Sequence, residues 1–247
     1  MQEVLRALAE RRPPPGRIAL VCAHPDDETI GGSLLLASAP DLLLVHVTDG
    51  APPADAARLG FRDSEAYADA RRAELRAALA TAGSRAEAVT LHVPDQGVAP
   101  AMRAVAAVLG ALLREHGAEC VVTHPFEGGH PDHDATAFAV AHGWDGAVLE
   151  MTSYHANADG SLAAHCFLPG ETEETHLDLT DAEADRKRRM MACFNTQAEV
   201  LAGFSATHEA YRPAPRYRWS RPPAPVIYYD QFPWGLTSAR WKELACP

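Results

Sequence analysis

Residues 17–48, RIALVCAHPDDETIGGSLLLASAPDLLLVHVT, decide the fold. Within this stretch, Arg17–Ala23 and Asp41–Thr48 are apolar runs of strand length, a pattern typical of strands that are buried on both faces. Between them, Thr29–Ser38 opens with the pair Gly31-Gly32 and is predicted to be a helix packed tightly on the sheet. The stretch is therefore expected to form a β-α-β unit, in which the two strands are parallel.

The same alternation continues along the chain. Further strands are predicted at Ala88–Val93, Glu119–Thr123 and Ala147–His155, and further helices at Asp63–Ala82 and Ala99–His116. Strict alternation of strands and helices implies parallel strands joined by right-handed crossovers. We therefore expect an α/β fold of Rossmann-like type, with an open, mostly parallel sheet and helices on both of its faces.

The last third of the chain is less regular. The pattern loosens after Asp159, and one long helix is then predicted over Asp181–Phe204. A Pro-rich surface stretch over Arg212–Pro225 follows, and a last short helix is predicted near Ser238–Ala245. This region is expected to elaborate the core fold at its C-terminal end.

The chain shows no internal repeat and no clear linker. We therefore expect a single domain over residues 1–247, in which residues 1–155 form the α/β core and residues 156–247 the C-terminal elaboration. The segment Asp49–Gly60 is expected to be a loop at the carboxyl end of the second strand.

The charge balance restricts the class of partner. The sequence has 33 acidic and 22 Lys or Arg residues, a formal net charge of -11 that repels phosphate backbones, so nucleic acid is not an expected partner. No stretch is long and apolar enough to suggest a membrane span, and the N-terminus lacks the apolar segment of a signal peptide. A cytoplasmic protein is expected, and assembly into a homo-oligomer is left open.

Two polar segments follow two of the predicted strands directly. AHPDDE occupies residues 23–28, and HPFEGGHPDH occupies residues 124–133. In an open parallel sheet the carboxyl ends of the strands open on one edge, where ligands bind. Segments that are distant in the sequence are therefore expected to face each other across one site.

Each segment spaces candidate metal ligands three residues apart, His24 with Asp27 and His130 with His133. That spacing in a first helical turn projects both side chains to one side. Two His and one carboxylate form a usual catalytic zinc set that leaves one position for water, and Fe²⁺ and Co²⁺ accept the same set. Only three of these candidates are needed, so the spacing predicts a metal site without choosing its ligands.

The pair of motifs, AHPDDE and HPDH, resembles the LmbE-like, or PIG-L, family of zinc-dependent N-acetylglucosaminyl deacetylases. The resemblance extends from the first strand to about His155. It implies that His24, Asp27 and His133 bind Zn²⁺, and that the substrate is a small-molecule N-acetylated sugar or a glycoconjugate.

The resemblance also implies roles for three further residues. Asp26 would be the general base, His130 would steady the developing oxyanion in its protonated form, and Asp132 would raise the pKa of His130 through a hydrogen bond. Some sugar-thiol members carry a Tyr two residues before the first His of HPDH, where this chain has Gly128. Tyr154 is the candidate substitute for that Tyr, and a half-buried structural aromatic is the alternative interpretation.

Substrate contacts are less strongly specified by the sequence. Arg71 resembles a sugar-contacting Arg of the family, although a solvated helix-face Arg paired with Glu74 or Glu65 is an equally good interpretation. Asp49 and Asp95 follow the second and third strands at the expected ligand-binding edge, and His155 stands beside Tyr154 at the end of the fifth predicted strand.

The sequence thus predicts a zinc-dependent hydrolase that removes the N-acetyl group from a GlcNAc-type amino sugar or its conjugate. Two alternatives remain. An amidase that cleaves a larger acyl group from a sugar conjugate would differ in the volume of its acyl pocket. A non-catalytic metal- or sugar-binding protein would not require Asp26 and His130, and the presence of both residues argues against it.

Overall fold

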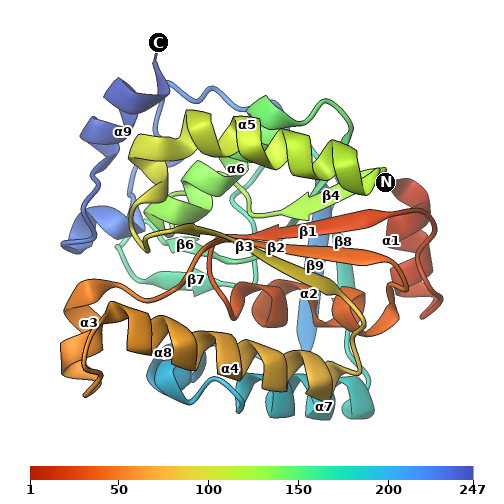
Figure 1. Ribbon diagram of the computed structural model, residues 1–247. Helices are drawn as coiled ribbons and strands as arrows, with labels where there is room; N and C mark the ends of the chain where they lie inside the picture. The colour runs from red at the N-terminus through yellow and green to blue at the C-terminus, as the bar shows by residue number, and fades with distance from the viewer. Residues whose placement is uncertain (247) are drawn as a thin grey trace.

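The computed structural model describes residues 1–246, and its centre is a seven-stranded sheet with the order β3-β2-β1-β4-β5-β9-β8 (Figure 1). The strands are β1 (Ile18–Cys22), β2 (Leu42–Thr48), β3 (Glu87–Val93), β4 (Cys120–Thr123), β5 (Ala147–Met151), β8 (Thr175–Asp178) and β9 (His208–Pro213). Two short strands, β6 (Tyr154–Ala156) and β7 (Leu162–Ala164), form a separate antiparallel pair.

The first five strands are parallel, as the sequence predicts. β1 pairs with both β2 and β4, β2 pairs with β3, and β4 pairs with β5, all in parallel register. The chain then extends the sheet with β9, which is antiparallel to β5, and β8, which is antiparallel to β9. The predicted Rossmann-like, mostly parallel α/β fold is confirmed, and the C-terminal segment contributes two strands to the same sheet.

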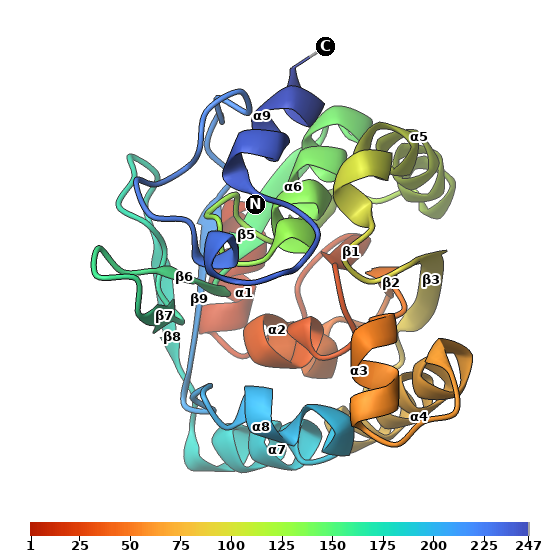
Figure 2. The ribbon, with the colours of Figure 1, turned by 90° about the vertical axis from the view of Figure 1, so that its left-hand side faces the viewer.

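Helices cover both faces of the sheet. The helices are α1 (Gln2–Ala9), α2 (Asp27–Ser38), α3 (Pro53–Arg58), α4 (Ser64–Ala82), α5 (Val98–His116), α6 (Pro131–Gly143), α7 (Asp181–Met191), α8 (Ala198–Leu201) and α9 (Ser238–Ala245). Figure 1 shows α5, α6 and α9 on one face and α2, α4 and α7 on the other. Figure 2 shows from the side that α2 lies between the sheet and the outer helices α4 and α7.

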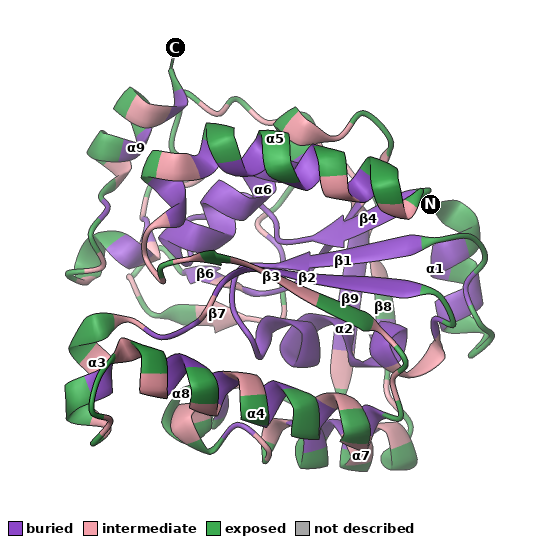
Figure 3. Ribbon diagram, viewed as in Figure 1, coloured by how far each residue is buried: buried purple, intermediate pink, exposed green. Residues whose placement is uncertain are grey.

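The sheet separates two apolar cores because successive side chains of a strand point to opposite faces. Leu20 of β1 and Leu44 of β2 pack in the core beneath α2, whereas Val21 and Val45 pack in the core beneath α5 and α6. The central strands are buried along their whole length, as Figure 3 shows. This two-sided burial explains their continuous apolar runs in the sequence.

Helix α2 packs directly on the ends of β1 and β5. A Cβ atom on Gly31 would lie 2.7 Å from the sulfur of Met151 and 3.0 Å from the carbonyl oxygen of Thr152, so no larger residue fits there. At Gly32 the backbone leaves helical geometry, with φ -133° and ψ 25°, and α2 is broken at this point. The Gly pair therefore gives close approach to the sheet, as predicted, and also an interruption of the helix.

Some element predictions differ from the structure, two of them at the carboxyl ends of strands. The predicted strand Ala147–His155 ends at Met151, because Tyr154 leaves the main sheet and pairs with Ala164 in the small β6–β7 sheet. The segment Asp49–Gly60, predicted as a loop, contains the short helix α3, which begins at a proline that is well suited to a first helical turn.

The long helix predicted over Asp181–Phe204 ends at Met191. Phe194 is fully buried in the core beneath α2, and the backbone N–H and hydroxyl of Thr196 donate to the carboxylate of Glu74. These tertiary contacts interrupt the helix, and the chain continues as a 3₁₀ turn at Asn195–Gln197 followed by α8.

The sequence prediction missed β9, whose end was assigned to the Pro-rich surface stretch. This strand carries Glu209 and Arg212, which are charged but almost fully buried. Each has a buried partner of opposite charge, Lys187 and Glu150 respectively. Because two of its residues are charged, hydropathy alone does not indicate that this strand is buried.

Within residues 1–246, no helix combines the length and apolar character that crossing a bilayer requires.

Candidate active site

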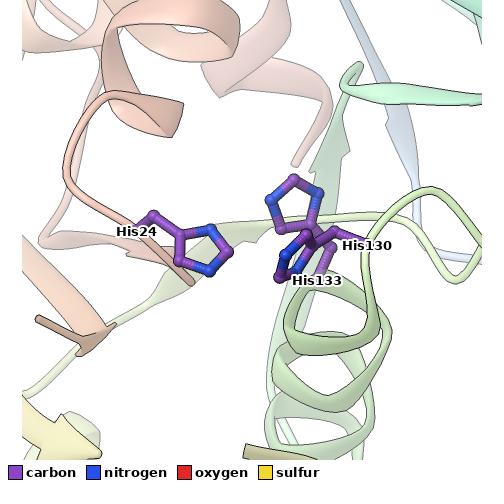
Figure 4. A group of neighbouring side chains, drawn as sticks. All are labelled: His24, His130 and His133. Atoms are coloured by element: carbon purple, nitrogen blue, oxygen red, sulfur yellow. The ribbon is translucent and has the colours of Figure 1, made fainter. Parts of the chain in front are cut away.

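The two motifs meet at the carboxyl ends of β1 and β4. These strands are direct neighbours, and Ile18 pairs with Cys120 in parallel register. The ring centroids of His24 and His130 lie 4.5 Å apart, and those of His24 and His133 lie 5.3 Å apart. Figure 4 shows the three rings gathered between the end of β1 and the start of α6.

The carboxylate of Asp27 connects the two motifs. Its Oδ1 lies 3.2 Å from Nε2 of His133, and its Oδ2 lies 3.4 Å from Nδ1 of His24. The same Oδ2 accepts a hydrogen bond from the backbone N–H of His24 at 2.8 Å. All three side chains are buried. The structure thus brings together the two imidazoles and one carboxylate that were expected to bind a metal.

The outer nitrogen of each imidazole has its own polar partner. Nδ1 of His133 lies 3.1 Å from the hydroxyl of Ser153, and Nε2 of His24 lies 3.4 Å from the carboxylate of Asp132 and 3.6 Å from that of Asp95. Such partners fix the orientation of a ligating His and leave its other nitrogen free for a metal. The donor set therefore fits a divalent transition metal such as Zn²⁺.

The centre offers more donors than a three-ligand site uses. Overlapping groups whose ligating atoms all lie within 4.8 Å of one another are His24 with His130 and His133, Asp27 with His124 and His133, and His24 with Asp95 and Asp132. His124 stacks on His133, with ring centroids 4.0 Å apart and an interplanar angle of 7°. The predicted set is not itself one of these groups: His133 shares one group with His24 and another with Asp27.

The electrostatics around Asp27 and His133 favour the protonation states that a metal requires of these two residues. Burial alone would raise the pKa of Asp27, but His133 and His124 outweigh it and hold that pKa well below its ordinary value. Burial lowers the pKa of His133 to about 4 in spite of the Asp27 charge. Asp27 is therefore ionised and His133 neutral at neutral pH, as metal ligation demands.

His24 behaves differently from His133. Burial alone would lower its pKa, but the carboxylates of Asp95, Asp132 and Asp27 outweigh this effect and raise the pKa well above the ordinary value. A cation is thus stabilised at this position, whether it is a proton on the ring or a metal beside it.

Asp26 points to a different partner from that of Asp27. Its Oδ2 lies 3.0 Å from a guanidinium nitrogen of Arg71, which also donates to the carbonyl oxygen of Pro25. The residue has φ 128°, an unusual backbone conformation for a non-glycine residue and one that clusters at functional sites. Burial raises the pKa of Asp26 to about 7, although Arg71 opposes this effect. A pKa near neutrality suits a general base.

The expected hydrogen bond from the carboxylate of Asp132 to the ring of His130 is not formed. The Asp132 carboxylate instead accepts from the backbone N–H groups of Gln96 at 2.6 Å and Val98 at 3.1 Å, which anchors the loop between β3 and α5. Nδ1 of His130 accepts the backbone N–H of Asp132 at 3.1 Å, so this ring caps the N-terminus of α6. An acceptor at Nδ1 leaves the proton of the neutral ring on Nε2.

The environment of His130 keeps the ring neutral. Burial lowers its pKa to about 3, and the neighbouring His24 lowers it further. This environment favours a neutral imidazole that donates from Nε2, in place of the protonated ring that the sequence-based mechanism expects. Helix N-termini are known to favour the neutral form.

A cavity of 170 Å³ opens onto this cluster. Of the four candidate substrate-contacting residues, Arg71 and Tyr154 line it. Asp49 does not: its carboxylate accepts the backbone N–H of Ala51 at 3.1 Å and caps its own loop. His155 also lies outside the lining, with its ring bonded to the carbonyl oxygen of Ala156. Asp95, which follows β3, lies in the lining as its place at the sheet edge implied.

Arg71 is only 1% exposed, and its Nη1 lies 3.9 Å from the carboxylate of Glu74. Neither Nε nor Nη1 has a hydrogen-bond partner among the described residues. It is therefore a buried residue that contacts both Asp26 and Glu74, so the pairing of the alternative interpretation is present although the side chain is not solvated. The aromatic Tyr154 packs edge-on to the ring of His133, with centroids 5.3 Å apart. The side chain is half-buried, and burial raises the pKa of its hydroxyl well above the ordinary value.

The loop before HPDH explains the position of Gly128. This residue has φ 73°, and a Cβ atom on it would lie 2.6 Å from Cδ1 of Ile227. Neither the conformation nor the space admits a Tyr here. The next residue, Gly129, packs against the backbone of Tyr154, which places that Tyr beside the loop where the family's Tyr would otherwise stand.

The C-terminal third supplies part of the cavity wall that sequence reasoning missed. Gln197 and Phe204 flank α8, and Trp234 lies with its ring centroid 4.8 Å from that of His130. From the other side, Tyr67 of α4 bonds Gln197 at 2.6 Å. No motif marks these residues, because their contribution arises only when α8 and the C-terminal loop fold back over the sheet edge.

Comparisons with known proteins agree with the geometry. The sequence model of the PIG-L family, described as GlcNAc-PI de-N-acetylase, matches residues 19–144, which include both motifs. A comparison with curated proteins gave no match.

Several solved structures share the fold. The zinc-inhibited form of teicoplanin deacetylase Orf2 has a TM-score of 0.65 at 16% identity, covering 82% of this chain and 99% of that chain. GalB, the 4-carboxy-2-hydroxymuconate hydratase of Pseudomonas putida KT2440, has a TM-score of 0.57 at 18% identity, covering 82% and 98%. N,N'-diacetylchitobiose deacetylase from Pyrococcus horikoshii has a TM-score of 0.53 at 19% identity, covering 81% and 84%. At these identities the likeness shows the fold.

Proposed function

The chain belongs to the PIG-L family, and from this membership and the geometry of the site we propose that it is a zinc-dependent hydrolase that removes the N-acetyl group from a GlcNAc-type amino sugar or its conjugate. The observation that carries the proposal is the arrangement around Asp27. Its carboxylate lies between two imidazoles, while the carboxylate of Asp26 next to it points to a different partner in the same cavity.

We assign His24, Asp27 and His133 as the metal ligands. A zinc ion held by these residues would supply Lewis-acid chemistry for polarising the amide carbonyl and acidifying water. The chain itself supplies the orientation of the ligands, through Ser153 behind His133 and Asp132 behind His24. Asp132 is thus assigned a positioning role toward His24 and the Gln96 loop rather than toward His130.

Asp26 is assigned as the general base. Its carboxylate lines the cavity, and its pKa near 7 lets it accept a proton from water at neutral pH and return that proton to the leaving amine. Arg71 holds this carboxylate through a contact of 3.0 Å and so fixes the direction from which the proton is taken.

His130 and Tyr154 are assigned to the oxyanion. A neutral His130 can donate from Nε2 toward the cavity because its Nδ1 is occupied by the backbone of Asp132. Tyr154 lines the same cavity and remains protonated, so that its hydroxyl is a donor. Donors that are oriented before the reaction stabilise the charge that develops on the carbonyl oxygen.

The size of the cavity favours a small acyl group. Its 170 Å³ is small beside the ~300–1,000 Å³ that is usual for sites of drug-sized ligands. This supports removal of an acetyl group over the alternative of an amidase that accepts a large acyl chain within the cavity. A sugar ring would then lie toward the rim formed by Phe204 and Trp234.

The test is a screen of N-acetylated amino sugars and their conjugates for release of a free amine and acetate, with the apoprotein and the zinc-loaded protein side by side. We expect stoichiometric amine and acetate from the zinc-loaded protein only. Because GalB, a hydratase, shares the fold, the unsaturated acid that it hydrates is included in the screen. Hydration of that acid without amine release would overturn the proposal, as would zinc and sugar binding without turnover.

A further inference from the structure

The break in helix α2 is covered by two buried charged residues from the C-terminal third. The backbone N–H of Ser33 donates to Oε1 of Glu209 at 2.8 Å, its hydroxyl donates to the same oxygen at 2.5 Å, and the N–H of Leu34 donates to Oε2 at 3.3 Å. On the other side of the break, Nζ of Lys187 donates to the carbonyl oxygen of Ile30 at 2.6 Å.

The signs of these charges match the two ends of the break. A helix start exposes N–H groups and a partial positive charge, whereas a helix end exposes carbonyl groups and a partial negative charge. Glu209 therefore caps the second half of α2 and Lys187 caps the first half. The two side chains are fully buried and also contact each other at 3.2 Å.

This arrangement is costly in purely structural terms. A continuous α2 would satisfy its own backbone and would need neither charge, and a buried ion pair is often no more stabilising than well-packed apolar residues. The break therefore calls for another explanation, and the first half of α2 offers one. It is a single turn that begins at Asp26 and Asp27 and ends at the carbonyl group that Lys187 holds.

We propose that Glu209, together with Lys187, is a positioning residue for the metal centre, which fixes the separate first turn of α2 so that Asp27 faces His24 and His133. The inference rests on the ligands assigned above. Figure 2 shows the arrangement: α2 lies between the sheet and α7, the helix that carries Lys187. The C-terminal elaboration thus sets the geometry of a site whose ligands all come from the first part of the chain.

Two hydroxyl groups donate hydrogen bonds to the carboxylate of Glu209, and their removal provides a matched pair of variants. The hydroxyl of Ser33 bonds Glu209 from α2, whereas the hydroxyl of Tyr211 bonds it at 2.8 Å from β9. Ser33→Ala and Tyr211→Phe each delete one buried hydrogen bond to Glu209, but only the first loosens α2. Glu209→Gln removes the charge and disturbs all of these bonds.

The experiment measures zinc affinity by titration of each apoprotein, with urea unfolding and amide hydrogen exchange at Ser33 and Leu34 as parallel readouts. Loss of a residue that orients metal ligands typically costs about 10–100-fold in affinity. We expect a loss of about 10-fold or more for Glu209→Gln and a smaller loss for Ser33→Ala, with faster exchange at both amides. Tyr211→Phe should lose stability with unchanged zinc affinity.

The outcomes separate this inference from the proposed function. Wild-type protein that binds no zinc would overturn the ligand assignment itself. Zinc affinity equal to wild type in Glu209→Gln, or equal losses in Ser33→Ala and Tyr211→Phe, would show that Glu209 acts on the fold as a whole. Should Glu209→Gln fail to fold, the comparison of Ser33→Ala with Tyr211→Phe decides alone.

Discussion

Asp26 and Arg71 form a buried ion pair, in which Oδ2 of the carboxylate lies 3.0 Å from a guanidinium nitrogen. The two residues come from separate elements, the start of α2 and the middle of α4. The pair draws Asp26 away from the proposed metal ligands, and the neighbouring Asp27 is left to face the imidazoles. Adjacent carboxylates of one dipeptide are thereby given different partners.

This division predicts opposite effects for two conservative substitutions. Asp26→Asn should retain zinc and lose ~10²–10⁴-fold in kcat, because only the general base is removed. Asp27→Asn should lose zinc, because a neutral amide is a poor substitute for a carboxylate between two imidazoles. Metal content measured beside kcat checks both. Zinc lost from Asp26→Asn and retained in Asp27→Asn would reverse the assignment.

Removing the partner of Asp26 should slow the reaction without releasing the metal. Arg71→Met leaves Asp26 without the contact that orients it, and misplacement of a catalytic group can cost about 10²-fold in rate. The control is Arg72→Met, at the next position of α4, where the side chain is partly exposed and pairs with Asp69. Equal activity in the two variants would contradict the positioning role of Arg71.

The hydroxyl of Ser153 should contribute to metal affinity although it cannot reach the metal. It lies 3.1 Å from Nδ1 of His133, on the side of the ring away from Asp27. Ser153→Ala should weaken zinc binding by about 10–100-fold, as is usual for a partner of a ligating His. Ser161→Ala, in an exposed turn, is the control, and an unchanged zinc titration in Ser153→Ala would exclude the role.

Chelation should abolish activity and leave the fold intact. The sheet buries two extensive apolar cores, so the fold does not depend on a metal as a small zinc finger does. The measurement is the far-UV circular dichroism spectrum before and after removal of zinc, with amine release measured on the same samples. Loss of the spectrum on chelation would contradict this expectation.

The parts of the fold that follow from local pattern could be predicted from the sequence. The apolar runs of β1, β2 and β4 are buried on both faces, and their alternation with helices predicted that the strands are parallel. β9 could not be predicted in this way. Its Glu209 and Arg212 are polar in the sequence and become compatible with burial only through Lys187, Glu150 and Glu127, which are distant along the chain.

The same distinction between local pattern and contacts from distant segments applies to the candidate site. The spacing of His24 with Asp27 placed two donors on one turn, and strand order placed His133 beside them. The state of His130 was beyond the sequence, because it depends on which group approaches Nδ1, and that group is the backbone of Asp132. Asp49 and Asp95 had equivalent positions after their strands, but a local turn at Ala51 kept only the first away from the cavity.

The pairing of β1 with β4 also governs when the metal centre can exist during synthesis. The backbone N–H of Ala23 donates to the ring of His124, which lies 101 residues further along the chain. A nascent polypeptide that ends before β4 has His24 and Asp27 but not His133, so it has only part of the donor set. Contacts between distant segments close slowly, because the chain entropy is lost before the contact forms. Zinc loading is therefore a reporter of the long-range step of folding, and cannot precede it.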